Sequence, residues 1–442
     1  MPDSREDMLH ELQRDTFNYF RKEVNVNNGL IADSTQEHPV SSIAATGLGL
    51  SAYIVAAEQG FLTRVEARDL TLATLRFFCN SAQSTEPDAT GYKGFYYHFL
   101  NMKTGRRAWK SELSTIDTTF LLAGMLAAAT YFDKDTKAEF EIRERVDDLY
   151  LRVDWQWALH NGSLISHGWK PGRGFLKYRW SGYCEALLLY ILALGSPTYP
   201  VPKKCYEAWS SSYTWKELYG TSFLFANALF IHQLSHIWVD FRGIQDDFMR
   251  EKGIDYFENS RRATYIQQAH AQQNPSGFKG YGEYIWGFTA SSGPGPATQT
   301  IDGKKRRFYG YKARGVPDPD DGTIAPWAAV ASLPFAPEIV LPTLEHLEKI
   351  NLGSVRQHKY GFKSTFNPTF RIDDSNAERD GTKMWVSPVH YGLNQGPILL
   401  MIENYRSELI WDLMKRNPYI RRGLNRAGFT GGWLEDDEAT KK

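Results

Sequence analysis

The sequence predicts an all-α fold, an (α/α)6 barrel of six inner and six outer helices with long loops at one mouth. Helical periodicity recurs in twelve segments, and no pair of strands is of comparable strength. The segments also alternate: 43–57, 116–132 and 185–195 are apolar nearly all round, whereas 137–159 is amphipathic. A helix that is apolar on every face must be buried on every face, and an amphipathic helix covers it from outside.

The outer helices are the odd-numbered segments, 4–24, 63–82, 137–160, 203–214, 255–273 and 337–349. The inner helices are the even-numbered segments, 41–59, 116–132, 181–195, 223–238, 324–333 and 395–415. Gly195 and Pro197 are ordinary stop signals for the third inner helix.

The chain is expected to form a single domain, residues 1–442, because no Ser/Pro-rich or low-complexity linker interrupts it. Four connections are long: 83–115, 161–180, 274–323 and 354–394. Long connections tend to be functional in compact domains. Each leads into the N-terminal end of an inner helix, so all four are expected to gather at one mouth of the barrel.

The composition excludes some partners. Lys+Arg and Asp+Glu are both 51, which argues against dominant attraction to nucleic acid or an anionic membrane. No run of 18 apolar residues predicts a membrane span. The polar N-terminus shows no signal peptide, and two compartments stay open: periplasmic or secreted if a leader was removed, otherwise cytoplasmic.

Aromatic residues make up 14% of the chain and occur in polar, Gly-rich stretches as well as in apolar runs. Two interpretations are open, a large buried core or a polar cleft with flat apolar walls. In a chain of zero net charge, such a cleft suggests a neutral polar ligand.

We expect no metal or cofactor. The three cysteines form no CxxC pattern, and the Gly-rich loop at 277–287 lacks the GxxxxGK[ST] phosphate motif. His232 and His236 have the i, i+4 spacing of metal ligands, but no third ligand stands at useful spacing.

Three acids are candidates for catalysis. Ser114 and Asp117 fit a capping box, yet Glu112 lies close by and the aromatic run 94–99 precedes them, a combination typical of a sugar subsite. Glu185 stands in the first turn of its expected helix, where the helix dipole favours an acid. Among Trp169, Trp180 and Tyr183, desolvation would instead raise its pKa into the range of a proton donor.

Several long motifs resemble the bacterial glycoamylase-like family: GFYYHFLNMKTGRRAW, SELSTIDTTFLLAG, GYCEALLLYILALGSPTYP, HQLSHIWVDFRGIQD, YFENSRRATYIQQA, DDGTIAPWAAVASLPFAPE and GPILLMIENYR. The family includes the β-1,2-glucanases of glycoside hydrolase family 144 and is related to a domain of cyclic β-1,2-glucan synthases. The resemblance covers residues 10 to 433. It implies an (α/α)6 barrel, inverting hydrolysis of β-1,2-linked glucan, Glu185 as proton donor, and Glu112 and Asp117 as acids flanking the cleavage point.

One position departs from the family pattern. Family members usually read GIDQGP where this chain has Asn394 in the run 392–397. An Asp there could act as general base, whereas an amide cannot take the proton. An engineered inactive variant, a natural member with another base, and a diverged protein that binds without cleaving all remain open.

The sequence therefore predicts an inverting glycosidase, with Asp117 as the first candidate for the base and with Asp321 and Asp374 behind it. The alternative is a non-catalytic glycan-binding protein on the same scaffold. The residues expected to bind a neutral glucan are Trp109, Trp169, Trp180, Tyr183, His232, Gln233, Tyr281, Trp286, Asp321, Trp385, Tyr391, Asn394 and Gln395.

Overall fold

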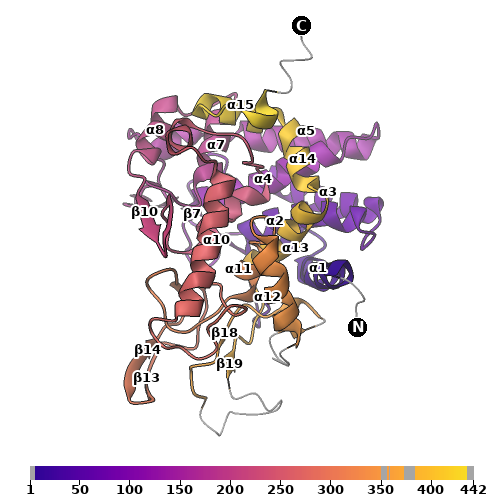
Figure 1. Ribbon diagram of the computed structural model, residues 1–442. Coiled ribbons are helices and arrows are strands. Elements are labelled where there is room, and N and C mark those ends of the chain that lie inside the picture. The colour runs from indigo at the N-terminus through magenta and orange to yellow at the C-terminus, as the bar shows by residue number, and fades with distance from the viewer. Residues whose placement is uncertain (1–4, 350–355, 358, 373–383, 436–442) are drawn as a thin grey trace. The chain divides into compact units, whose positions relative to one another are not determined.

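The computed structural model describes residues 5–349, 356–357, 359–372 and 384–435 (Figure 1). The chain forms two compact units, each made of three stretches. Unit 1 consists of Met1–Tyr19, Trp215–Leu234 and Glu258–Arg406. Unit 2 consists of Phe20–Thr214, Ser235–Phe257 and Ser407–Lys442.

Unit 2 is mostly helical. Its helices are α2 Ile43–Glu58, α3 Arg64–Asn80, α4 Thr115–Tyr131, α5 Lys137–Leu151, α6 Trp155–Leu159, α7 Leu187–Gly195, α8 Lys203–Ser210, α9 Asp247–Lys252, α14 Leu409–Arg416 and α15 Pro418–Ala427, with the 3-10 turns η2 Leu234–Ile237 from Ser235 onward and η3 Gly432–Leu434. All nine residues of α7 are buried, as are nearly all of α2 and α4. The expectation that these three segments lie inside is confirmed.

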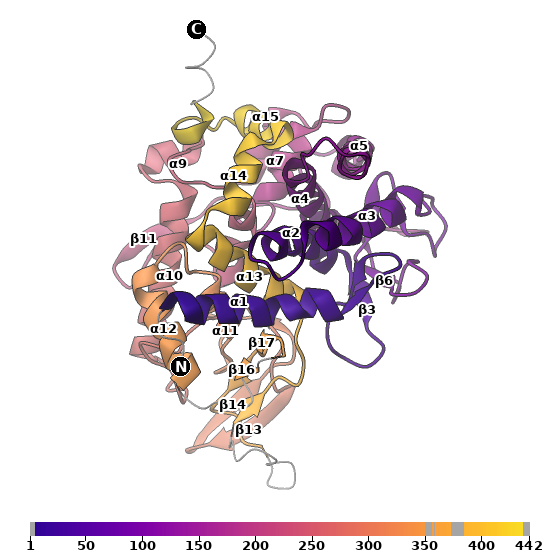
Figure 2. The same ribbon diagram turned by 90° about the vertical axis from the view of Figure 1, so that its right-hand side faces the viewer.

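Helices α2 and α4 lie side by side with their backbones in contact (Figure 2). A Cβ atom on Gly124 would lie 2.0 Å from the carbonyl oxygen of Gly47, and one on Gly47 would lie 2.3 Å from the carbonyl oxygen of Phe120. Glycine at both positions is therefore what permits this packing. Helices α7 and α15 meet in the same way at Gly423, whose Cβ would lie 2.0 Å from the Ile191 oxygen.

The long connections 83–115 and 161–180 of unit 2 combine into one antiparallel sheet of five strands in the order β4-β5-β7-β8-β9. Its strands are β4 Gly91–Tyr92, β5 Phe95–Tyr97, β7 Leu113–Ser114, β8 Gly168–Lys170 and β9 Gly174–Phe175. The other strands of the unit form two pairs, β1 Val24–Asn25 with β2 Leu30–Ile31 and β3 Val40–Ser42 with β6 Phe99–Asn101. Because β7 runs directly into α4, the sheet fixes the residues at the start of that helix.

Unit 1 contains α1 Arg5–Lys22 up to Tyr19, α10 Tyr256–Gln273 from Glu258 onward, η1 Leu229–His232, α11 Pro326–Val330, α12 Pro337–Lys349 and α13 Gly392–Arg406. Its strands form five antiparallel pairs: β10 Trp215–Leu218 with β11 Thr221–Leu224, β12 Ala290–Ser291 with β15 Lys312–Ala313, β13 Ala297–Ile301 with β14 Lys304–Phe308, β16 Arg356–Gln357 with β17 Gly361–Phe362, and β18 Phe366–Asn367 with β19 Trp385–Val386.

The expectation of a fold without convincing strand pairs was wrong, since the described residues contain nineteen short strands. Strands of two to five residues are too short to show a clear period-two pattern. The inner helix expected at 223–238 was also wrong, because this stretch contains the end of β11 and the turns η1 and η2. The N–H groups of Leu229 and Phe230 bond to Phe288 O and to Thr289 Oγ1, which takes them away from a helical ladder.

Three other expected helices have different bounds. The segment 137–160 divides into α5 and α6, because the Asp154 side chain caps a new helix by accepting a bond from Trp157 N–H. The segment 395–415 divides at Glu408, whose φ is +58°. The helix expected from 181 begins only at Leu187. No described helix has both the length and the apolar character needed to cross a membrane.

Replacing Gly124 by alanine is expected to lower the free energy of unfolding by about 1–3 kcal/mol, because its Cβ would overlap the backbone of α2. Urea unfolding measures this change. Gly282→Ala is the matched control, since a Cβ there meets nothing within 4 Å, and it should change stability by less than about 0.5 kcal/mol. Equal stability of the two variants would contradict the close contact of α2 and α4.

Candidate active site

The N-terminus of α4 holds the first acid of the site. Ser114 caps this helix: its Oγ accepts a bond from the Asp117 N–H at 3.2 Å and donates to Asp117 Oδ2 at 2.5 Å. Since Ser114 closes the helix end, the Asp117 carboxylate is not needed as a cap. It keeps 8% of its surface exposed and is held in one place by the serine.

Glu112 and His98 are in contact through both their backbones and their side chains, next to the five-stranded sheet. The His98 N–H donates to the Glu112 carbonyl at 2.9 Å, and the His98 ring nitrogen Nδ1 lies 2.9 Å from Glu112 Oε1. The same nitrogen is 3.7 Å from Asp117 Oδ2. The hydrogen bond from His98 is the largest influence on Glu112, and it lowers the pKa of this carboxyl to about 2 although burial opposes it.

His98 carries a positive charge in this setting. Burial, the largest single influence, lowers its pKa, but the charges of Asp117, Glu112 and Asp33 together with the Glu112 hydrogen bond outweigh burial and raise the pKa to about 9. The group is therefore an imidazolium at neutral pH.

Asp33 is a fourth acid of the site, and it was not predicted from the sequence. It follows β2, and its N–H donates to the Val40 carbonyl. Burial raises its pKa to about 6, and the Asp117 charge acts in the same direction. One signal was present in the sequence: an aspartate directly after the apolar run Leu30–Ile31–Ala32 is unusual unless it has a partner.

Glu185 lies in the turn before α7 and not within the helix, so the helix-dipole interpretation for a first-turn acid does not describe it. Residue Ala186 provides no side-chain cap for α7. Ser235 supplies one from another segment: its Oγ accepts a bond from Leu188 N–H at 3.2 Å and donates to the Glu185 carbonyl at 3.4 Å. This serine fixes the backbone of the acid against the start of the helix.

The pKa of Glu185 is raised to about 7. Burial is the main cause, and the negative charge of Asp117 adds to it, while the backbone N–H of Glu185 acts in the opposite direction. An acid with this pKa can give up a proton near neutral pH.

Four of the predicted aromatic residues belong to unit 2, as the acids do. Trp180 donates from Nε1 to Thr115 Oγ1 at 3.0 Å, which places it at the N-terminus of α4. Trp169 lies on β8 against Tyr92, with ring centroids 5.3 Å apart. Tyr183 packs near Tyr213 and Tyr256, and Trp109 is 67% exposed beside Phe99.

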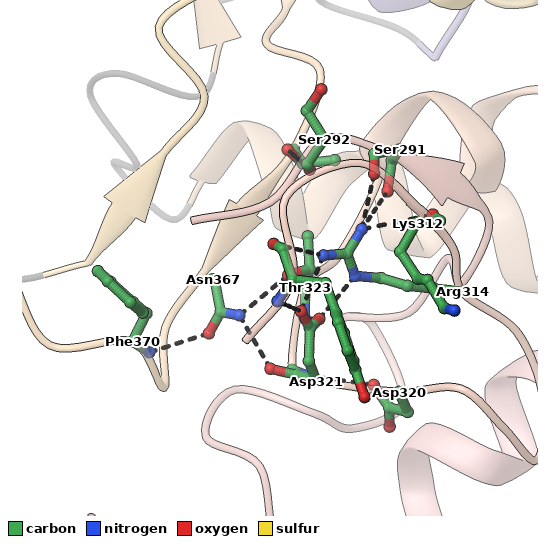
Figure 3. A network of polar contacts seen from close by, with 12 residues as sticks. Ser291, Ser292, Lys312, Arg314, Asp320, Asp321, Thr323, Asn367 and Phe370 are labelled. Atoms are coloured by element: carbon green, nitrogen blue, oxygen red, sulfur yellow. Dashed lines mark hydrogen bonds and ion pairs between the residues drawn. The ribbon is translucent and has the colours of Figure 1, made fainter. Parts of the chain in front are cut away.

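The structure does not support Asp321 of unit 1 as a base or a sugar ligand (Figure 3). This residue is fully buried, and its carboxylate accepts bonds from Arg314 Nε at 2.6 Å and Nη2 at 2.8 Å. The backbone N–H groups of Tyr309 and Thr323 also donate hydrogen bonds to the two oxygens of this carboxylate. A buried carboxylate with its acceptor sites filled cannot take a proton from water without losing this network. Asp374 lies outside the described residues.

Several other predicted residues of unit 1 are buried and bonded to their own surroundings. Gln233 donates to Ala328 O, Trp286 to Thr343 Oγ1, and Gln395 to Phe362 O. His232 is buried, which lowers its pKa to about 4 and keeps it neutral, and its Nε2 lies 3.2 Å from Ala226 O. These contacts give the four residues a structural role, and their contact with a sugar stays a prediction.

The remaining predicted residues of unit 1 also have defined contacts. The Asn394 Oδ1 accepts a bond from Ser364 Oγ at 2.8 Å, and Tyr391 OH lies 3.1 Å from Ser292 Oγ. Tyr281 donates its hydroxyl proton to Asp320, and Trp385 lies on β19. Their part in binding stays a prediction. Among the described residues, no group of three or more His, Cys, Asp or Glu is arranged to hold a metal ion.

Comparison with known proteins identifies relatives over almost the whole chain. The family model Glycoamylase, described as "Putative glucoamylase", matches residues 177–418. A crystal structure of a protein with the same description from Bacteroides uniformis ATCC 8492 is 31% identical and has a TM-score of 0.85, with 98% of this chain and 99% of that chain covered.

Several relatives have names that describe an activity, and two of them cover almost all of this chain. The endo-β-1,2-glucanase from Chitinophaga pinensis, solved with sophorotriose and glucose, is 26% identical, with a TM-score of 0.83 over 98% of this chain and all of that chain. The exo β-1,2-glucooligosaccharide sophorohydrolase (non-reducing end) of Parabacteroides distasonis is 27% identical over 96% of this chain. The chain spans 58% of the length of that curated relative.

Replacing Ser235 by alanine is expected to lower the free energy of unfolding by about 1–3 kcal/mol, because the buried Leu188 N–H loses its acceptor. Chemical unfolding measures the effect. The exposed Ser211, whose Oγ bonds only locally to Ala208 O, provides the control Ser211→Ala, which should stay within about 0.5 kcal/mol of the wild type. A Ser235→Ala protein as stable as this control would show that Ser235 does not cap α7.

Proposed function

Because this chain belongs to the Glycoamylase family and Glu185 is a buried acid on which the charge of Asp117 acts, we propose that it is an inverting glycoside hydrolase acting on β-1,2-glucan or its oligosaccharides. The observation that carries the proposal is the pKa of about 7 that burial and the Asp117 charge give to Glu185. The substrate class follows the names of the endo- and exo-acting relatives, both of which cleave β-1,2-linked glucose.

In the proposed reaction, Glu185 gives its proton to the oxygen that links the two glucose residues as that oxygen leaves the anomeric carbon. A water molecule attacks the opposite face of that carbon, and a carboxylate takes one of its protons. Attack from the opposite face converts the β-linkage into an α-configured product.

Asp117 is the proposed base. Its charge acts on Glu185, which means that the two groups belong to one electrostatic cluster, and Ser114 holds its position. Asn394 cannot serve, because an amide takes no proton at neutral pH. Asp321 is unsuited because its carboxylate is saturated with donors.

For the fold, we propose the finer arrangement of an (α/α)6 barrel in a single domain. The buried helices α2, α4 and α7 of unit 2 and α11 and α13 of unit 1 supply the apolar segments that such a barrel needs inside. The four long connections would then open at one mouth, with Trp109, Trp169, Trp180 and Tyr183 offering stacking surfaces to glucose rings.

Incubation with linear β-1,2-glucan is expected to release new reducing ends whose anomeric configuration is α when first formed, as followed by proton NMR. Glu185→Gln should lower kcat by a factor on the order of 100 or more while binding of the glucan persists, because an amide cannot donate the proton. Glu207→Gln, a change at an exposed acid of α8, is the matched control and should retain activity. Products of β configuration would contradict an inverting reaction.

Asn394 favours the second candidate, a glycan-binding protein that does not cleave. Its Oδ1 accepts a hydrogen bond from Ser364 Oγ, which holds the amide side chain in one orientation on α13. Binding of β-1,2-glucooligosaccharides without new reducing ends would support this candidate. Hydrolysis gained in Asn394→Asp would then identify the amide as the cause.

The pH dependence of kcat/KM supplies a separate test of Glu185. A proton donor must be protonated, so kcat/KM is expected to fall about tenfold per pH unit above a pKa of about 7 and to stay level just below it. Initial rates between pH 5 and 9 with a short β-1,2-glucooligosaccharide measure this limb. A profile that stays flat up to pH 9 would exclude Glu185 as the donor.

A further inference from the structure

His98 takes no part in the proton transfers proposed above, although its ring lies next to Asp117, the proposed base, and to Glu112. Its Nδ1 is 2.9 Å from Glu112 Oε1 and 3.7 Å from Asp117 Oδ2. One nitrogen thus contacts an acid beside the sheet and an acid on α4.

Two backbone hydrogen bonds and one ring contact hold His98 in position. The His98 N–H donates to the Glu112 carbonyl, and the His98 carbonyl accepts a bond from Ile43 N–H at the start of α2. The ring itself stacks on Phe99, with centroids 3.9 Å apart and an interplanar angle of 14°. The backbone and the stacking partner therefore hold the imidazole where it is.

The charged groups that act on His98 come from three other parts of unit 2. Glu112 precedes β7, Asp117 is on α4, and Asp33 follows β2. Lys170 of β8 adds a positive charge near Glu112. Carboxylates that share a partly buried place repel one another unless a cation stands between them.

We propose that His98 is a positioning residue whose ring, in contact with both carboxylates, holds Glu112 and Asp117 in place at the start of α4. The inference rests on the proposed function, because the roles of these acids come from it. Its physical basis is the hydrogen bond of the ring to Glu112 at 2.9 Å and its ion-pair contact with Asp117 at 3.7 Å, which together limit where the two carboxylates can move.

The proposal has a consequence for catalysis that a purely structural role lacks. Glu112 is one of the acids that the family resemblance places beside the cleavage point, and the hydrogen bond from His98 lowers the pKa of this carboxyl to about 2. Loss of the charge should therefore shift the acid limb of the pH profile upward. The alkaline limb is set by the pKa of Glu185, and His98 is not among the main causes of the shift in that pKa.

The pH profile of kcat/KM for His98→Gln tests this consequence. The glutamine keeps a hydrogen-bond donor and removes the charge, so the acid limb should move up by roughly one pH unit, with a much smaller change in the alkaline limb. His346→Gln, at a histidine of α12 in unit 1, is the control and should leave both limbs in place. A uniform loss of activity without a shift of the acid limb would overturn the proposal.

A second measurement requires neither substrate nor a variant of His98. In the wild-type protein with ¹⁵N-labelled histidines, one of the eleven imidazoles should keep both ring protons through pH 8 and titrate near pH 9. In Glu112→Gln, that titration should move down by roughly one unit. If no histidine titrates above pH 8, the proposal is overturned.

The two proposals can fail separately. A wild-type protein that cleaves no β-1,2-glucan would overturn the proposed function, and the histidine titration would still decide whether an imidazolium joins the two acids. A cleaving enzyme whose histidines all titrate below pH 8 would overturn the role of His98 alone.

Discussion

The charge of Asp117 acts on three other titratable groups of the site, Glu185, Asp33 and His98. It raises the pKa of Glu185 and of Asp33, and it stabilises the protonated form of His98. These effects exist because Ser114 holds the carboxylate at the first turn of α4, in a place where burial limits screening by water. The protonation of His98, Asp33 and Glu185 thus depends on the position of one side chain.

That position depends in turn on backbone packing some distance away. Asp117 and Gly124 lie on the same helix, and Gly124 allows α4 to touch the backbone of α2. The strand β7 before α4 joins the two long connections into one sheet, which brings Glu112 and His98 to the same helix end. A close helix pair and a small sheet together set the geometry of the acids.

Unit 1 uses a buried ion pair to order its loops. Arg314 is fully buried and binds Asp321 as well as the carbonyls of Ser291, Tyr309 and Gly310. The Cβ of any residue other than glycine at position 293 would lie 2.2 Å from the Arg314 guanidinium. A buried ion pair is maintained only if its remaining hydrogen-bonding groups are satisfied, and here the loop backbone satisfies them. The loop at 309–323 is therefore built around the pair.

Most helices could be predicted because their apolar patterns extend over many residues. The patterns of α2, α4 and α7 identified buried helices, and the acids Glu112, Asp117 and Glu185 were found from their neighbours in sequence. The short strands, the turns at 229–237 and the cap from Ser235 could not be predicted, since their hydrogen bonds join segments far apart in the chain.

By itself, the sequence determined which segments must be buried as helices, which family the chain resembles and which acids stand beside aromatic residues. Only the tertiary structure decided that Asp33 and His98 join these acids, that Asp321 is occupied by Arg314, and that Glu185 precedes its helix. Burial periodicity is a local property that the order of residues records directly. Burial of a charge and its partners are properties of three-dimensional neighbours, which spacing along the chain does not specify.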